Sequence, residues 1–258
     1  MMHPFTEALN EREFALLEAT GLGTKARVLL RGPVTVAVAP LGWISGLAAA
    51  LLAFALGSGH QFGWEVAGSL VAALLMVASL VAHEYGHLVL ARHAKGITPR
   101  MIVVRASGGV AVVEGRYEDA RGAALFAAGG PIATALVSVL LLVAAALVPA
   151  PLRDGFLVPA ALNALQLVLN LIPIAPTDGY LLFRSGVWAG IGNRAEAERR
   201  ALDWSRAVVM WAAFVGLSVL ARGSRYALVT LFFVGTLALQ HHSVARRMGA
   251  KKAPAPTR

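Results

Sequence analysis

The sequence contains no cysteine and few charged residues. Without cysteine, the 258-residue chain can form neither disulfides nor thiolate metal sites, and its redox compartment stays undetermined. Only 14% of the residues are charged, whereas 57% are hydrophobic and the mean hydropathy is +0.67, which is typical of a membrane protein. The net charge of +9 comes without a basic stripe carrying interleaved aromatic residues, so a positive-inside bias explains it better than nucleic-acid binding.

The N-terminal residues also lack the apolar core and cleavage site of a signal peptide. Residues 1–32 mix acidic and basic side chains, and we expect a cytoplasmic N-terminal segment there with an amphipathic helix at 6–19. Residues 33–245 are the expected membrane-embedded domain. The basic tail at 246–258, rich in alanine and proline, is expected to be disordered.

Runs without charge predict an all-α polytopic membrane protein with about six transmembrane helices. Pro173 and Pro176 must break the fourth span, and a helical continuation is expected at 178–191. A solvated connecting helix is expected at 195–206. The expected spans are 33–56, 65–91, 123–148, 156–172, 204–221 and 226–240.

The distribution of basic residues predicts the orientation in the membrane. With the N-terminus in the cytoplasm, the cytoplasmic segments hold 20 of the 23 Lys and Arg residues, and both termini lie inside. The external loops then keep Arg153, Arg222 and Arg225. Under this orientation the second span ends, and the fourth span arrives, at the cytoplasmic side of a cell membrane.

The second span ends in the sequence His83-Glu84-Tyr85-Gly86-His87. Residues four apart lie one helical turn apart, so both imidazoles face the same way and can hold one zinc ion. Glu84 would then act as the catalytic base. The alternative is a pair of snorkelling histidines with an interfacial glutamate, although ionisable groups in membrane helices are costly and usually functional.

A catalytic zinc takes three protein ligands, so a third ligand is needed. By the charge argument, His60, Glu65 and Asp154 fall on the external side. His93 lies six residues past His87 and points elsewhere. Asp178 lies on the cytoplasmic side beside the proline-broken helix and is the predicted third ligand. Its alternative role is that of a helix N-cap.

Residues 97–115 differ in composition and pattern from the long apolar runs. Two β-branched stretches, 101–104 and 110–113, flank Gly108 and Gly109, which predicts a short membrane-associated β-hairpin between the second and third spans. An ordinary cytoplasmic hairpin is the alternative, but the stretches are too apolar for a solvated loop. We expect a strand edge here to pair with unwound substrate, and Val103 and Val112 are the expected edge positions.

These motifs together resemble the site-2 protease family of intramembrane zinc metalloproteases. Besides the His-Glu-x-x-His segment, residues 170–179 (NLIPIAPTDG) match the family's Asn-x-x-Pro-x-x-Pro-x-Asp-Gly pattern at every specified position. Residues 128–131 (AGGP) resemble its Ala-Gly-Pro segment, and the Gly108–Gly109 stretch lies where the family has its hairpin. The resemblance covers about residues 80–184. The rest of the chain offers no room for a PDZ or CBS domain, which suggests a minimal member of the bacterial kind.

The chain departs from the family pattern at a few positions. Thr177 replaces the common leucine before Asp-Gly, Thr134 stands where asparagine is frequent, and Tyr180 and Leu181 replace small or basic residues. None of these changes removes a ligand or the base. The family's logic also implies substrate or backbone binding by Asn170, for which a structural cap is the alternative.

The expected activity is hydrolysis of transmembrane substrates near the cytoplasmic face, with one Zn²⁺ per chain. Single-span membrane proteins are the expected substrates, the lipid bilayer is the expected surrounding, and regulated intramembrane proteolysis is the role that the resemblance implies. A membrane transporter or an inactive zinc-binding scaffold would also place His, Glu and Asp in a membrane. The clustering of these residues at one face argues against the transporter, and the intact Glu84 argues against the scaffold.

Overall fold

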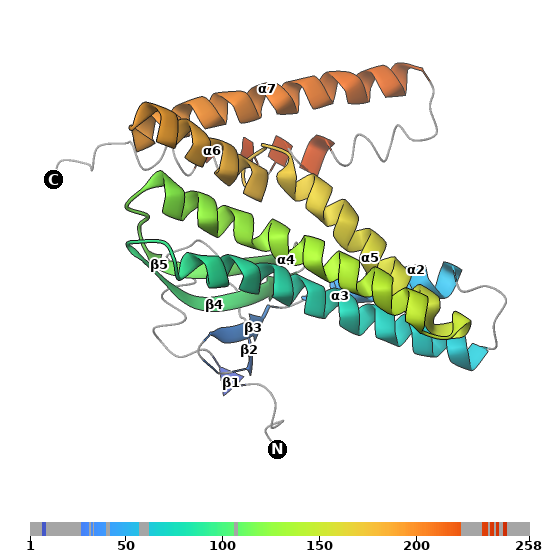
Figure 1. The fold of residues 1–258 in the computed structure, drawn as a ribbon. Helices are drawn as coiled ribbons and strands as arrows, with labels where there is room; N and C mark the ends of the chain where they lie inside the picture. Colours follow the sequence, from blue (N-terminus) through green and yellow to red (C-terminus); the bar gives the residue numbers. More distant parts are fainter. Residues whose placement is uncertain are drawn as a thin grey trace. The chain divides into compact units, whose positions relative to one another are not determined.

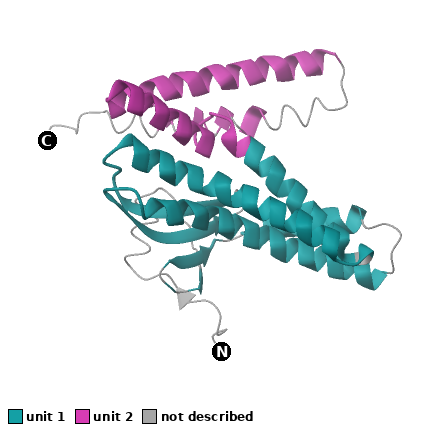
Figure 2. Cartoon of the chain, in the orientation of Figure 1, with its two compact units in different colours: residues 1–168 teal, residues 169–258 magenta. Residues whose placement is uncertain are grey.

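Figure 1 shows the computed structural model of the chain, which describes residues 7–8, 27–30, 32, 34–39, 42–56, 62–105, 108–222, 234–236, 238–239, 241–242 and 245–246. The chain divides into two compact units, residues 1–168 and residues 169–258 (Figure 2). The first unit contains a small sheet, helices α2 to α4 and most of α5. The second contains the end of α5 with helices α6 and α7.

The sheet of the first unit has five strands in the order β1-β2-β3-β4-β5. Neighbouring strands are antiparallel except for the parallel pair β3–β4. The predicted hairpin is confirmed as β4–β5, paired from Ile97 opposite Gly115 to Arg105 opposite Gly108. Among the described strands, β5 pairs with β4 alone, so its outer side is an edge of the sheet. The strands are β1 (Glu7–Ala8), β2 (Arg27–Leu30), β3 (Thr35–Val38), β4 (Ile97–Arg105) and β5 (Gly108–Gly115).

Three expectations for this part of the chain are wrong. Residues 7–8 form a strand instead of part of a helix at 6–19, whose remaining residues lie outside the described ones. The first apolar run opens with β3, so the helix that follows it, α2, covers only Ile44–Leu56. The alternating Thr-Val-Ala-Val sequence of β3 suits a strand, and it pairs in parallel with β4. Val103 therefore lies on an interior strand and not at an edge.

Helices α3 (Phe62–Ala91) and α4 (Ala120–Leu147) lie side by side in the first unit (Figure 1). The two backbones approach closely at Gly86 and Gly129, because a Cβ atom on either glycine would lie 2.2–2.3 Å from the other's carbonyl oxygen. Small residues allow such close crossings of membrane helices. The buried stripe of α3 repeats at helical spacing and includes Gly68, Ala72, Met76, Ser79, Leu80, His83 and His87.

The second unit pairs α6 (Asp178–Ile191) with α7 (Arg194–Ala221) through a short turn. Gly192 ends α6 in the left-handed conformation, and Asn193 caps α7 by accepting a hydrogen bond from the Glu196 amide. The expected connecting helix at 195–206 and the fifth span are thus one continuous helix. The sixth expected span, 226–240, lies outside the described residues apart from 234–236 and 238–239.

Four helical stretches in the described part of the chain are long and apolar enough to cross a membrane. They are α3, α4, residues 152–171 of α5 (Ala150–Leu171) and α7, while α2 is a shorter apolar helix. Leucines on the outer face of α3, such as Leu70 and Leu74, are more than half exposed, as side chains that contact lipid tails would be. A mostly helical membrane protein with a small sheet is therefore confirmed, whereas the count of six spans stays a prediction.

Candidate metal centre

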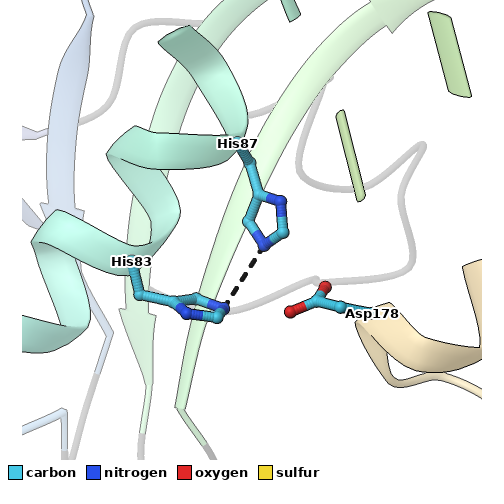
Figure 3. A group of neighbouring side chains, drawn as sticks. All are labelled: His83, His87 and Asp178. Atoms are coloured by element: carbon cyan, nitrogen blue, oxygen red, sulfur yellow. Dashed lines mark hydrogen bonds between the residues drawn. The ribbon is translucent and has the colours of Figure 1, made fainter. Parts of the chain in front are cut away.

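Two histidines on the last turns of α3 face one another in the first unit. His83 and His87 are one turn apart, and each is only 3% exposed. Their Nε2 atoms lie 3.3 Å apart, and the ring planes are nearly perpendicular at 87° (Figure 3). Both rings thus present the same nitrogen to one point in a buried environment.

The other nitrogen of each ring is held by α4. His87 Nδ1 lies 2.6 Å from the carbonyl oxygen of Phe126 and 3.2 Å from the amide nitrogen of Gly130. The shorter contact is to the carbonyl, which can only accept, and it favours the tautomer with the proton on Nδ1. His83 Nδ1 lies 2.7 Å from the hydroxyl oxygen of Thr134. Where Thr134 accepts in the same way, both Nε2 atoms carry lone pairs toward each other. In that tautomer the two atoms need a cation between them, whereas a proton on one Nε2 gives the hydrogen bond drawn in Figure 3.

The geometry of this pair suits zinc. Zn–N bonds of about 2.0–2.1 Å at a tetrahedral angle place two ligand nitrogens roughly 3.3–3.4 Å apart. The observed separation of the Nε2 atoms is 3.3 Å. Zinc-binding histidines also usually donate their second N–H to an oxygen, as His87 does to Phe126. The donor set and its spacing therefore fit a zinc ion.

Glycine brings the backbone of α4 against the imidazoles. A Cβ atom on Gly130 would lie 2.3 Å from His87 Nε2 and 2.7 Å from His83 Cε1, so any side chain there would occupy the space around the ligand nitrogens. The Phe126 ring stacks on His87 with ring centres 4.8 Å apart and planes at 24°. The Ala-Gly-Gly-Pro segment of the sequence therefore shapes one wall of the histidine pair.

Glu84 lies under the first residues of the edge strand. Its side chain is buried, with 6% of the residue exposed, and it follows His83 on the same turn of α3. A Cβ atom on Gly109 would lie 2.3 Å from Glu84 Cγ and 2.6 Å from its Oε1. The start of β5 is thus in direct contact with the candidate base. Gly108, with φ at +118°, has the backbone conformation that favours glycine.

Asp178 and Asn170 belong to the second unit and are described within it. Thr177, not Asp178, is the N-cap of α6, because its hydroxyl accepts a hydrogen bond from the Tyr180 amide. The alternative that Asp178 serves as the cap is therefore wrong. Asp178 is the first helical residue, where the helix dipole favours the ionised carboxylate. Asn170 is half-buried on the last turn of α5, and its role stays a prediction.

Several residues around the histidines were not expected from the sequence. Phe126 acts through its carbonyl and its ring, and Gly86 acts through close helix packing. Thr134 was expected only as a departure from the family pattern, and its hydroxyl oxygen lies 2.7 Å from His83 Nδ1. A glycine inside the motif on α3, together with a Gly-Gly pair on α4, was the available signal for the close crossing of the two helices.

The chain is similar in sequence to two named proteins. No family model matches the chain. It is 32% identical over 169 residues to the "Putative zinc metalloprotease Rip3" of Mycobacterium tuberculosis, a stretch covering 63% of this chain and 42% of that protein. It is 34% identical over 128 residues to the "Putative zinc metalloprotease sll0528" of Synechocystis, covering 48% and 33%. The chain thus spans less than half the length of these relatives.

A solved structure shares the fold. The "Site-2 Protease from Methanocaldococcus jannaschii" matches with a TM-score of 0.50 and 19% identity, covering 84% of this chain and 95% of that one. The fold likeness extends over nearly the whole of that protease. The chain therefore shares the fold of this site-2 protease and is similar in sequence to two proteins named as putative zinc metalloproteases.

Proposed function

We propose that the protein is an intramembrane zinc metalloprotease that hydrolyses peptide bonds of transmembrane substrates. His83, His87 and Asp178, whose side chains are drawn in Figure 3, are the proposed ligands, and each offers one ligand atom. Glu84 is the proposed base. The observation that carries the proposal is the pair of buried Nε2 atoms at 3.3 Å, next to a buried glutamate under an edge strand.

The chemistry divides between the metal and the chain. When bound, zinc supplies Lewis acidity, which polarises a carbonyl group and makes water more acidic. Glu84 takes the proton from the attacking water and delivers it to the leaving amine nitrogen. Its burial beside Gly109 keeps it at one position. The hydrogen bonds of Phe126 and Thr134 orient the two imidazoles so that neither has to reorganise during the reaction.

The edge of β5 is the proposed docking strand for substrate. A transmembrane helix must unwind before its peptide bonds become accessible, and its freed backbone groups then need partners, because each unsatisfied one costs several kcal/mol in hydrocarbon. Strand addition to β5 supplies these partners. Since Gly109 at the start of β5 touches Glu84, a paired substrate would pass the base directly. Gly108, Gly109 and Asn170 are accordingly the proposed substrate-binding residues.

The proposed setting is a cell membrane with both termini in the cytoplasm and cleavage near the cytoplasmic face. The 20 basic residues assigned to cytoplasmic segments support this orientation. Reporter fusions that are active only outside the cytoplasm test it, with activity expected after Arg153 and silence after Arg121. Single-span membrane proteins are the proposed substrates, and regulated intramembrane proteolysis is the proposed role.

The decisive experiment compares Glu84→Gln with His87→Ala in purified protein. Glu84→Gln should abolish cleavage of a single-span substrate and keep the zinc, because Glu84 is a base and not a ligand. His87→Ala should lose the zinc and the activity together. Cleavage by Glu84→Gln at the parent's rate would refute the mechanism. A parent protein that binds zinc but cuts no substrate from a panel would favour the inactive scaffold.

A further inference from the structure

Two departures from the family pattern flank the proposed aspartate ligand. Thr177 precedes Asp178 where leucine is common, and Tyr180 follows Gly179 where small or basic residues are frequent. Both residues are joined by hydrogen bonds to other parts of the second unit.

Thr177 ties the start of α6 to the end of α5. Its hydroxyl oxygen accepts from the Tyr180 amide at 3.2 Å, and its hydroxyl donates to the carbonyl oxygen of Ile172. Its own amide donates to the carbonyl oxygen of Ile174 at 2.9 Å. A leucine at this position could make only the last of these three bonds. One side chain thus fixes the loop before Asp178 and the first turn after it.

Tyr180 ties the same turn to α7. The residue is 2% exposed, and its hydroxyl donates to Glu198 Oε1 at 2.8 Å. The other carboxylate oxygen, Oε2, accepts from Arg184 Nη1 at 3.0 Å. Glu198 therefore joins two residues of α6 to α7.

Two backbone features tighten the same region. The Ala175 amide donates to Ser205 Oγ on α7 at 3.0 Å, which holds the loop from a second point on that helix. A Cβ atom on Gly179 would lie 2.2 Å from the carbonyl oxygen of Leu171, so α6 begins directly against the end of α5. Asp178 therefore sits in a turn whose backbone is held on both sides.

An aspartate side chain has only two torsions, so the backbone of its turn limits the directions that its carboxylate can take. We propose that Thr177 and Tyr180 are positioning residues that hold the first turn of α6 so that the carboxylate of Asp178 is preoriented as a metal ligand. Thr177 acts through Ile172 and Tyr180 acts through Glu198. The inference rests on the proposed zinc site, and it assigns a role to two residues that the family pattern does not specify.

The test measures zinc affinity by competition with a chelator, which does not require activity. Thr177→Val keeps the shape of the side chain and removes the hydroxyl, and Tyr180→Phe removes only the phenol oxygen. Each should weaken zinc binding by about tenfold, the lower end of the effect seen for groups that orient ligands. Thr177→Ser, which restores a hydroxyl, should bind zinc with nearly the parent's affinity.

A pair of matched variants on α7 separates this role from general damage. Glu198→Ala should weaken zinc binding as Tyr180→Phe does, and the double variant should be no weaker than the worse single one, because both remove the same link. Glu196→Ala, two residues away, removes an exposed carboxylate that pairs with Arg199 and Arg200. It should leave the zinc affinity unchanged.

The outcomes distinguish the two proposals. Unchanged zinc affinity in Thr177→Val and Tyr180→Phe, with a lower melting temperature of the zinc-free protein, would show a structural role and overturn the inference. The protease proposal would survive that result, provided that these variants still cut substrate. If the parent binds zinc but cuts no substrate, and the variants bind zinc more weakly than the parent, the inference would be supported and the proteolytic function overturned.

Discussion

Replacing Gly109 with alanine tests whether the edge strand and Glu84 work as one unit. The added methyl carbon would lie 2.3 Å from Glu84 Cγ, whereas nonbonded carbons prefer about 3.5–4.0 Å. One of the two must therefore move by about 1 Å. Gly109 is paired with Val104 on the interior strand β4, which resists displacement, so Glu84 is the group that moves. A misplacement of about 1 Å can cost roughly a hundredfold in rate.

The assay compares kcat and zinc content of the parent and Gly109→Ala with a single-span substrate in detergent. We expect kcat to fall about a hundredfold while one zinc per chain remains, because the three atoms nearest to the added carbon all belong to Glu84. Gly186→Ala is the matched control, since a Cβ atom there meets nothing within 4 Å. A folded, zinc-loaded Gly109→Ala protein with the parent's kcat would refute the contact between strand and base.

Two further predictions concern the groups around the histidines and the substrate. Thr134→Val removes the hydroxyl that lies on His83 Nδ1, and zinc affinity measured by chelator competition should fall about ten- to a hundredfold, with Thr134→Ser close to the parent. Single proline substitutions at 110, 111 and 113 test the edge of β5. Cleavage should fall only for the substitutions at residues whose amide points away from β4, which alternate along the strand, while zinc content stays constant. Uniform cleavage across that scan would exclude substrate pairing with β5.

The features that depend on local geometry could be predicted from the sequence. The spacing of His83 and His87 fixes their common direction on any helix, and the β-branched runs around Gly108 and Gly109 predict a hairpin without help from the rest of the chain. Strand β3 could not be predicted in this way. Its four residues open an apolar run, where a short buried strand and the start of a membrane helix have the same pattern. Only the distant partner strand β4 decides between them.

The surroundings of the histidines were harder to predict than the histidines themselves. Phe126 supports His87 through a backbone carbonyl, which every residue type possesses, so no side-chain pattern marks it. Thr134 and Thr177 each stood at a family position as a departure. The structure gives both a hydrogen bond that depends on the hydroxyl. Departures from a motif thus carried structural information that the matches did not.

The same surroundings decide against snorkelling histidines, the alternative left open by the sequence. A snorkelling side chain keeps its polar end in water or among headgroups. His83 and His87 instead turn their Nδ1 atoms into α4, and a side chain on Gly130 would collide with both rings. If the histidines at the end of α3 only needed to reach water, glycine would not be required at position 130 of α4. The close approach of Gly86 to α4 serves the same end, because it brings the Phe126 carbonyl within reach of His87. The glycines allow the two imidazoles to lie with their Nε2 atoms 3.3 Å apart, a separation that suits a shared cation.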